Sequence, residues 1–506
     1  MQYFDQYPVY RQWPLGSRRM HLAGEPLVDH DTPVVHFGSC FGENIQLFLD
    51  MYHFNLLETQ AGYKYSCHSI LREVRNAFEG RLTKLDQIYP GIKGYTDLNH
   101  HRIFDQDQEQ CQRKINAIER NVQTALSQAE VVILTPSVNE VWFNRRTQDY
   151  ILHPYPGALG ADDDLHVHSM TTHENLVQLE QTREILLQYN PNMQIIIGVC
   201  PISLRLTYQE MDAVQGNNIS KFTIYAAVNE FCQAHANVHY FPGFDIVFSE
   251  LAGKGHYRED NRHLTQPAVR HYLRRFGSMF FSPRARRIAA LLEQYAASPE
   301  RERWTCLENL ADLGYDPDLI AIKAANTHLL AGQTKEAFDR LCRVSVIPES
   351  PALGLNLGLL LLDLGLPSKA APFLKRSVDL LGDLPGLAFG MADRAHRKSL
   401  GDNHMRECGN TSDQRLGALG RMLKLATAAL ETLPVGLKPG LRSLQFMDIL
   451  DRTLFPVGMS QPGAASESPP RVAAHPALFS HAPETAAFDH CGDLPAALGA
   501  LARQEG

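Results

Sequence analysis

The chain has 506 residues, of which 44% are hydrophobic and 21% charged, so its length and composition predict more than one soluble globular domain. Its formal net charge of −8 and its pI near 6.3 argue against a nucleic-acid partner, because such proteins usually present a concentrated basic surface.

The sequence contains no apolar run of about 18 residues, so no membrane span is expected, and its first residues lack the order of a secretory signal. The nine cysteines form no Cys-x-x-Cys pair, which is typical of reduced thiols in a cytoplasmic protein. Most of them, including Cys200 and Cys232, are interpreted as small buried apolar residues. Metal-ligand spacings and phosphate or dinucleotide loops are absent from the sequence, so no cofactor is expected.

Residues 1–31 form an N-terminal extension, and from residue 32 to 282 short apolar runs alternate with amphipathic stretches. The apolar runs predict four buried strands of parallel type, at 34–37, 131–134, 195–199 and 238–241. The intervening stretches predict crossover helices, at 43–52, 69–78, 111–128, 174–188 and 221–236. This alternation predicts an α/β domain with a doubly wound parallel sheet, whose ligands bind at the carboxyl ends of the strands.

The pattern between residues 283 and 400 is helical throughout and contains an internal echo offset by 33 positions. In this echo Gly332 corresponds to Gly365, and Ala337 corresponds to Ala370. The period is similar to that of tetratricopeptide-type hairpins, which are about 34 residues long, and it predicts a protein-binding repeat domain. A plain helical bundle is the alternative.

The remaining residues divide into two stretches. Further helices are predicted in 401–456, and the Pro-, Ala-, Ser- and Gly-rich tail 457–506 is predicted to be mostly disordered.

A candidate nucleophile follows the first predicted strand, where a glycine turn at Gly38 leads through Ser39 and Cys40 into a helix. A helix N-terminus favours an anion, so it is expected to lower the pKa of the Cys40 thiol and to stabilise an oxyanion. Ser39 is the rival nucleophile. The structural alternative is a capping serine beside a buried cysteine.

Other polar residues follow later elements of the same predicted domain. Asp260 and His263 are three positions apart, so they face the same way and the carboxylate can fix the imidazole tautomer that a general base needs. Asn139 and Glu140 follow a buried strand, where an amide can donate to an oxyanion. Gly62 lies in a loop where its backbone N–H can approach a ligand closely.

The string Phe37-Gly-Ser-Cys-Phe-Gly-Glu-Asn44 resembles the signature of the GSCFA-domain family, Gly-Ser-Cys-Phe-Ala, with Gly42 in place of the alanine. The resemblance covers about residues 32–281 and is supported by four further strings: Val138-Asn-Glu-Val-Trp142, Asn218-Ile-Ser-Lys221, Tyr240-Phe-Pro-Gly-Phe-Asp245 and Glu259-Asp260 leading to His263. The family looks like a branch of the SGNH/GDSL hydrolases, which implies a flavodoxin-like three-layer sandwich.

The resemblance also implies roles for individual residues. It places Cys40 at the nucleophile position, makes Gly62 and Asn139 the oxyanion donors, and makes Asp260 and His263 the orienting acid and the base.

The implied activity is acyl transfer on an ester, as an esterase or an O-acyltransferase, through Cys40 or Ser39. Because bacterial SGNH enzymes often act on acylated carbohydrates, the expected substrate is an acylated small molecule, glycan or polysaccharide, on fold-level analogy. The rival hypothesis is a non-catalytic binding protein, in which the α/β domain is degenerate and the helical repeats bind a protein partner.

Overall fold

The computed structural model describes residues 24–381 apart from 53, 58, 60, 92–93, 101–102, 146–147, 153–164, 344–350 and 364–365, together with residue 427. The predictions for the N-terminal 23 residues, for the helices of 401–456 apart from residue 427, and for the tail 457–506 lie outside the described residues. The chain divides into two compact units, residues 1–49 with 53–283 and residues 50–52 with 284–506, which we describe separately.

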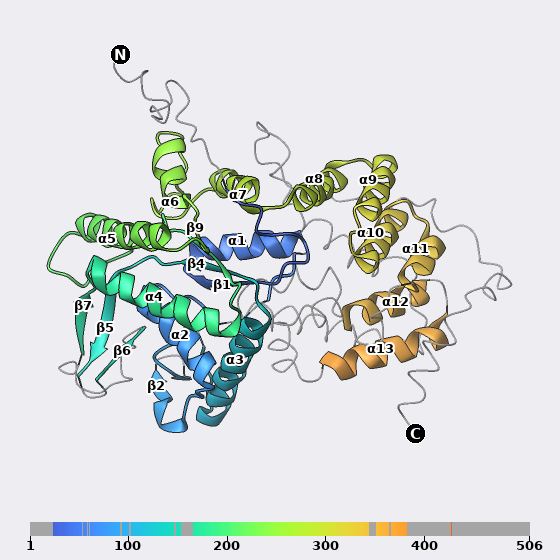
Figure 1. The fold of residues 1–506 in the computed structure, drawn as a ribbon. Helices are drawn as coiled ribbons and strands as arrows, with labels where there is room; N and C mark the ends of the chain where they lie inside the picture. Colours follow the sequence, from blue (N-terminus) through green and yellow to red (C-terminus); the bar gives the residue numbers. More distant parts are fainter. Residues whose placement is uncertain are drawn as a thin grey trace, which may run out of the picture. The chain divides into compact units, whose positions relative to one another are not determined.

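A parallel sheet forms the centre of the first unit (Figure 1). Its four strands lie in the order β1 (Val34–Gly38), β4 (Val131–Thr135), β8 (Gln194–Ile197) and β9 (Val238–Tyr240). The three strands β1, β4 and β8 are buried along nearly their whole length, which explains why they read as continuous apolar runs. The predicted α/β class with a parallel sheet is therefore confirmed.

A short extended segment lies beside the outer edge of β1. The Val34 N–H donates to the Asn55 carbonyl at 2.9 Å, and the Leu57 N–H donates to the Val34 carbonyl at 2.7 Å. Since Val34 and Leu56 also form a parallel bridge, the chain passes along β1 before it enters the next helix. This passage brings the loop after residue 57 to the carboxyl end of β1.

The five predicted helices are all present, and one more closes the first unit. They are α1 (Cys40–Met51), α2 (Cys67–Glu79), α3 (Gln108–Gln128), α4 (Thr172–Tyr189), α5 (Ala213–Ala234) and α7 (Gln266–Phe280). Figure 1 shows the sheet between α1 and α7 on one side and α2, α3 and α4 on the other. Helix α5 begins eight residues earlier than predicted, because the Asp212 side chain accepts a hydrogen bond from the Val214 N–H and caps it.

Two small antiparallel sheets were not predicted. One pairs β2 (Tyr89–Gly91) with β3 (Gly94–Thr96), and the other has the order β6 (Asp149–Ile151), β5 (Glu140–Asn144), β7 (Leu165–Ser169). These strands have three to five residues and are half-buried, so they lack the continuous apolar runs of the central sheet. Short helical turns complete the unit: η2 (Leu85–Gln87), α6 (Gly243–Asp245) and η4 (Ile246–Glu250).

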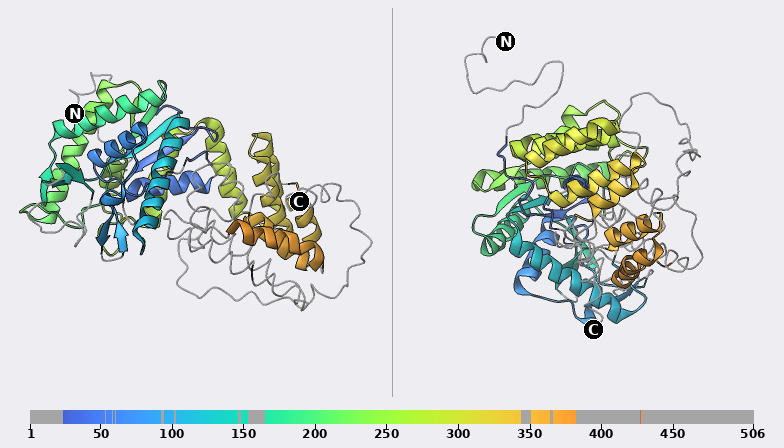
Figure 2. Two further views of the ribbon diagram at one scale, coloured as in Figure 1. Left: turned by 90° about the horizontal axis from the view of Figure 1, so that it is seen from below. Right: turned by 90° about the vertical axis from the view of Figure 1, so that its right-hand side faces the viewer.

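The described part of the second unit is helical, as predicted. Its helices are α8 (Pro283–Ala297), α9 (Glu300–Asp312), α10 (Pro317–Leu330), α11 (Thr334–Leu341), α12 (Pro351–Asp363) and α13 (Pro367–Leu381). Helices α12 and α13, drawn in orange, pack side by side in both figures that show the ribbon (Figures 1 and 2). A Cβ on Gly358 of α12 would lie 2.6 Å from the Leu374 side chain of α13, so a larger residue there would have to displace Leu374.

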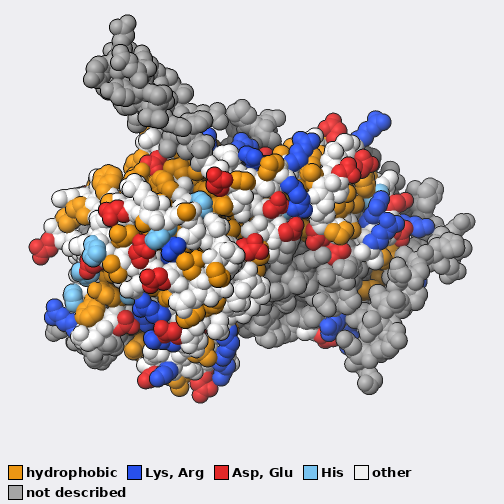
Figure 3. Space-filling view, viewed as in Figure 1, with side chains coloured by type: hydrophobic (Ala, Val, Ile, Leu, Met, Phe, Trp, Pro, Cys, Tyr) orange, Lys and Arg blue, Asp and Glu red, His pale blue; other side chains and the backbone are white. Residues whose placement is uncertain are grey.

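The described surface of the first unit is mixed in character. In Figure 3 hydrophobic side chains and charged side chains of both signs are interspersed over the visible face. None of the described helices is long and apolar enough to cross a membrane.

Candidate functional site

The turn between β1 and α1 is pinned to the end of β4. The Ser39 N–H donates to both the carbonyl and the hydroxyl of Thr135, at 3.2 and 3.1 Å. Gly38 has φ +153°, and a Cβ there would lie 2.0 Å from the Thr135 hydroxyl. Only glycine fits this approach, so the turn holds Ser39 and Cys40 at the carboxyl edge of the sheet.

The two candidate nucleophiles differ in access. Ser39 is only 1% exposed, and its hydroxyl has no described partner at hydrogen-bonding geometry. That hydroxyl faces the thiol of Cys200, a fully buried residue three positions after β8. Cys40 is half-buried and is the first residue of α1. Of the two, Cys40 is the more accessible to a ligand.

The thiols of Cys40 and Cys200 are neighbours, close to the ammonium of Lys221. The interaction with Cys200, followed by burial, raises the pKa of the Cys40 thiol. Burial also opposes ionisation of Cys200, but the interaction with Cys40 and the Lys221 charge outweigh it and lower the pKa of Cys200. The expectation of a lowered pKa for Cys40 is therefore wrong, because the second sulfur dominates over the helix N-terminus.

Lys221 belongs to the site although no sequence pattern assigned it a role. It is 1% exposed, and its ammonium donates to the carbonyl and the hydroxyl of Ser137 at 2.7 and 3.0 Å. Its neighbour Ser220 accepts a hydrogen bond from the Asn139 N–H at 2.9 Å. The string Asn218-Ile-Ser-Lys221 thus fixes the loop after β4. Cys200 was likewise misread as an inert apolar residue, although it lies beside the nucleophile turn.

The acid–imidazole pair is formed as expected. Asp260 accepts from the His263 backbone N–H at 3.0 Å, and its other carboxylate oxygen lies 2.5 Å from His263 Nδ1. The bond to the His263 side chain comes first among the causes that lower the pKa of Asp260. Both side chains are about 45% exposed, and His263 Nε2 makes no hydrogen bond to any described residue. This nitrogen is available to a ligand.

The loop of this pair docks on the segment that carries Cys200. Arg262 Nε donates to the Ser203 carbonyl at 3.0 Å, and the Arg262 charge is one cause of the lowered pKa of Lys221, after burial. The pair and the thiols therefore lie at one edge of the sheet. Among the described residues, however, His263 makes no hydrogen bond to Ser39 or Cys40.

The remaining predicted site residues differ in their exposure and in their hydrogen-bond partners. Gly62 is exposed with φ +70°, a conformation that favours glycine, in a loop tied to the nucleophile turn. Asn139 is buried, and its side-chain amide donates to the Met170 carbonyl at 3.1 Å. Glu140 accepts hydrogen bonds from the Thr207 hydroxyl and the Tyr208 N–H, so it anchors that loop instead of facing the thiols.

Close neighbours explain the glycine at position 42, where the family signature has alanine. A Cβ on Gly42 would lie 1.9 Å from His36 Nε2 and 2.4 Å from the Thr135 hydroxyl. His36 is held there by its 3.1 Å contact with the same hydroxyl, and burial lowers the pKa of His36 to about 4, so the ring is neutral. The His36 ring and the Thr135 hydroxyl therefore occupy the space that an alanine methyl at position 42 would take.

We expect Gly42→Ala to destabilise the first unit by about 1–3 kcal/mol, because an added methyl in a packed core forces side chains to shift. Urea denaturation measures the change in the free energy of unfolding, and hydrogen exchange of the β1 and β4 amides shows whether the change lies at this site. The double variant His36→Ser/Gly42→Ala should lose less stability than the sum of the two single variants. Additive losses would contradict the steric explanation.

No group of three or more His, Cys, Asp or Glu side chains that could hold a metal ion occurs among the residues with described positions.

Comparison with known proteins gives one match. Residues 33–276 match the model of the GSCFA family, which confirms the resemblance seen in the sequence. The match indicates a hydrolase-like domain and names no reaction. No match was found among curated proteins or among solved structures.

Proposed function

We propose that the GSCFA-family domain at residues 33–276 is an SGNH-like catalytic domain that transfers an acyl group from an ester, with Cys40 or Ser39 as nucleophile and His263 as base. One observation carries the proposal. Three separate segments, containing Cys40, Cys200 and the Asp260–His263 pair, meet at the carboxyl edge of one parallel sheet. Ligands of such sheets bind at this edge.

The chemistry follows from these groups. His263 Nε2 accepts the proton of the Cys40 thiol, while Asp260 holds the ring by Nδ1. The sulfur attacks the ester carbonyl, and backbone N–H groups of the turn, with Gly62 and the second amide proton of Asn139, stabilise the oxyanion. The alcohol leaves with the proton from His263, and a thioester remains on Cys40. Water or a sugar hydroxyl then takes the acyl group.

Two features of the site bear on this mechanism. The Lys221 ammonium lies close to both sulfurs, so it stabilises a thiolate at either of them. Contacts between a base and its nucleophile are often long without substrate, so the missing bond from His263 to Cys40 is compatible with a base role.

The finer parts of the proposal rest on analogy and sequence pattern. We take the substrate to be an acylated glycan or polysaccharide, by analogy with SGNH enzymes. The α10–α11 and α12–α13 hairpins repeat the small residues of the 33-residue echo, which supports a tetratricopeptide-like surface for a protein partner. The free cysteines support a reducing, cytoplasmic setting.

A second candidate function is binding without turnover. It is favoured by the raised pKa of Cys40, which keeps the thiol protonated, and by the engagement of the Asn139 amide with Met170. Under this alternative the same sheet edge would hold an ester or a related ligand intact.

Removal of the base separates the two candidates. We expect His263→Ala to lower kcat/KM for p-nitrophenyl acetate and for acetylated oligosaccharides by roughly 10²- to 10⁴-fold, the usual contribution of a general base. His235→Ala is the matched control, since His235 also pairs with a carboxylate at 2.7 Å, but it follows the end of α5 and its partner Glu180 lies on α4. Its rate should equal that of the unaltered protein.

Two results would count against catalysis. The first is that the unaltered chain releases no acyl group from any ester in the panel. The second is that His263→Ala retains the full rate. Either result, together with saturable ester binding, would favour the binding function.

A further inference from the structure

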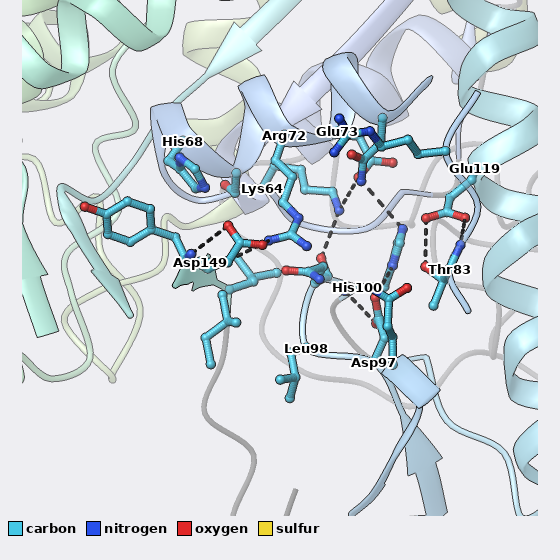
Figure 4. A pocket seen from close by; sticks show the side chains of 18 of the residues that line it. Lys64, His68, Arg72, Glu73, Thr83, Asp97, Leu98, His100, Glu119 and Asp149 are labelled. Atoms are coloured by element: carbon cyan, nitrogen blue, oxygen red, sulfur yellow. Dashed lines mark hydrogen bonds and ion pairs between the residues drawn. The ribbon is translucent and has the colours of Figure 1, made fainter. Parts of the chain in front are cut away.

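A polar cavity of about 540 Å³ lies in the first unit beside the nucleophile edge, within the size range of small-molecule sites. Its lining comes from α2, from the loops around residues 81–89 and 97–100, and from the ends of β5 and β6. Figure 4 shows charged side chains from these segments pointing toward one another across the cavity. None of the predicted catalytic residues lines it.

The floor of the cavity is a buried network of two cations and two anions. Lys64 Nζ lies 2.7 Å from Glu73 Oε2, and His100 Nδ1 lies 2.8 Å from Asp97 Oδ2. All four residues are at most 5% exposed. Burial disfavours a charged His100, but the Asp97 carboxylate outweighs burial and raises the pKa of His100 to about 9. The charges of these four residues therefore balance at neutral pH.

The rim is also largely paired. Arg72 donates to the Asp149 carboxylate at 2.8 Å and to the Tyr150 carbonyl at 2.6 Å. Burial lowers the pKa of His68 to about 4, so this ring is neutral. Lys84 is the one cation of the described lining without an ionic partner, and it is exposed. A strongly charged ligand would have to break an existing ion pair, which leaves a buried charge uncompensated.

Neutral polar groups, in contrast, are free. The side chains of Asn76, Tyr89 and Asn99 and the hydroxyl of Tyr150 line the cavity and make no hydrogen bond to any described residue. The neutral ring of His68 also lines the cavity. Carboxamides, phenols and a neutral imidazole both donate and accept, as hydroxyl groups do. The two tyrosines add aromatic surface.

We propose that this cavity binds a neutral sugar unit, whose hydroxyl groups satisfy these free donors and acceptors. A polyhydroxylated ring needs no ion pair to be broken, and it can exchange its water hydrogen bonds for those of the lining. The proposal extends the proposed function by naming the place of the glycan, and it rests on that function only for the step from binding to turnover.

The cavity adjoins the nucleophile turn through one loop. The Lys64 N–H donates to the Gly38 carbonyl at 2.8 Å, while the Lys64 side chain enters the cavity. The carbonyl of Tyr65 accepts from the N–H groups of Ser137 and Val138 at 2.7 and 3.0 Å. The loop that carries Gly62 therefore separates the cavity from the carboxyl ends of β1 and β4.

The test measures binding without turnover. The full chain is titrated, by calorimetry and by saturation-transfer NMR, with methyl glycosides of glucose, galactose, mannose and N-acetylglucosamine and with their oligomers. Glucuronate and glucose 6-phosphate serve as charged comparators. We expect saturable binding of at least one neutral glycoside. Asn76→Ala and Asn99→Ala should each weaken it by roughly two- to tenfold, the effect of one lost hydrogen bond.

Matched variants distinguish this proposal from the catalytic one. Asn229→Ala, at an exposed asparagine of α5 outside the cavity, and His263→Ala should both leave the affinity unchanged. Binding without acyl release would support the cavity and count against the proposed catalysis. Absence of binding across the panel, equal affinity in Asn76→Ala and Asn99→Ala, or a preference for the charged comparators that Lys84→Gln abolishes would overturn the sugar assignment.

Discussion

Replacement of Cys40 by alanine is expected to lower the rate of acyl transfer by about 10³- to 10⁶-fold, as removal of a covalent nucleophile does elsewhere. Ser39→Ala should retain activity within about tenfold, because Ser39 is 1% exposed and its hydroxyl faces a buried sulfur and not the solvent. Single-turnover assays with an acyl ester measure both rates. Mass spectrometry of the quenched reaction should locate the acyl group on Cys40.

The control for this experiment is Cys232→Ala. Cys232 is also half-buried, but it lies on α5, and burial raises the pKa of its thiol to about 12. Its replacement should not change the rate. If instead Ser39→Ala abolishes activity and Cys40→Ala retains it, the serine is the nucleophile and Cys40 has a supporting role.

The second large effect concerns stability. Lys64→Met is expected to cost about 3–5 kcal/mol of the free energy of unfolding, because it leaves the Glu73 carboxylate buried without its closest cation. Lys84→Met, at an exposed lysine of the same cavity, should cost less than about 0.5 kcal/mol. Urea denaturation compares the free energies of unfolding of the two variants, and hydrogen exchange of the α2 amides shows whether the loss is local to this helix.

The pH dependence of this cost has a defined sign. Burial opposes the charge of Glu73, but Lys64 and His100 outweigh it and lower the pKa of Glu73 from 4.5 to about 2 in the folded chain. A lowered folded-state pKa contributes stability that is complete above pH 4.5 and is lost as the pH falls through 2. The difference between the unaltered chain and Lys64→Met should therefore shrink as the pH is lowered from 7 toward 3. A difference independent of pH would point to lost packing.

The elements that could be predicted from sequence are those with a long, uniform signal. The strands β1, β4 and β8 are buried on both faces, so their apolar runs identify them directly. The Asp260–His263 pair was predictable because both partners lie in one short segment. The hairpin of β5 and β6 was not predicted, because its strands are short and half-buried.

The parts of the site that were missed depend on contacts between distant segments. Cys200 lies 160 positions from Cys40, and no local pattern indicates that the two thiols meet. The sign of the Cys40 pKa shift was wrong for the same reason, since it is set by Cys200 more than by the helix that begins at Cys40. Lys221 had one signal, a lysine inside a family string, but its contact with Ser137 appears only in three dimensions.

The loop through Gly62 and Lys64 faces both the nucleophile turn and the polar cavity. Its position is fixed by the bond from Lys64 N–H to Gly38, and by the 2.5 Å bond from the Tyr63 hydroxyl to Glu43 of α1. A ligand that orders Lys64 from the cavity side should also reduce the conformational freedom of Gly62. A second ligand at the nucleophile turn would then lose less conformational entropy on binding. We therefore expect a ligand in the cavity and an acyl group at the nucleophile turn to strengthen each other's binding by the same factor.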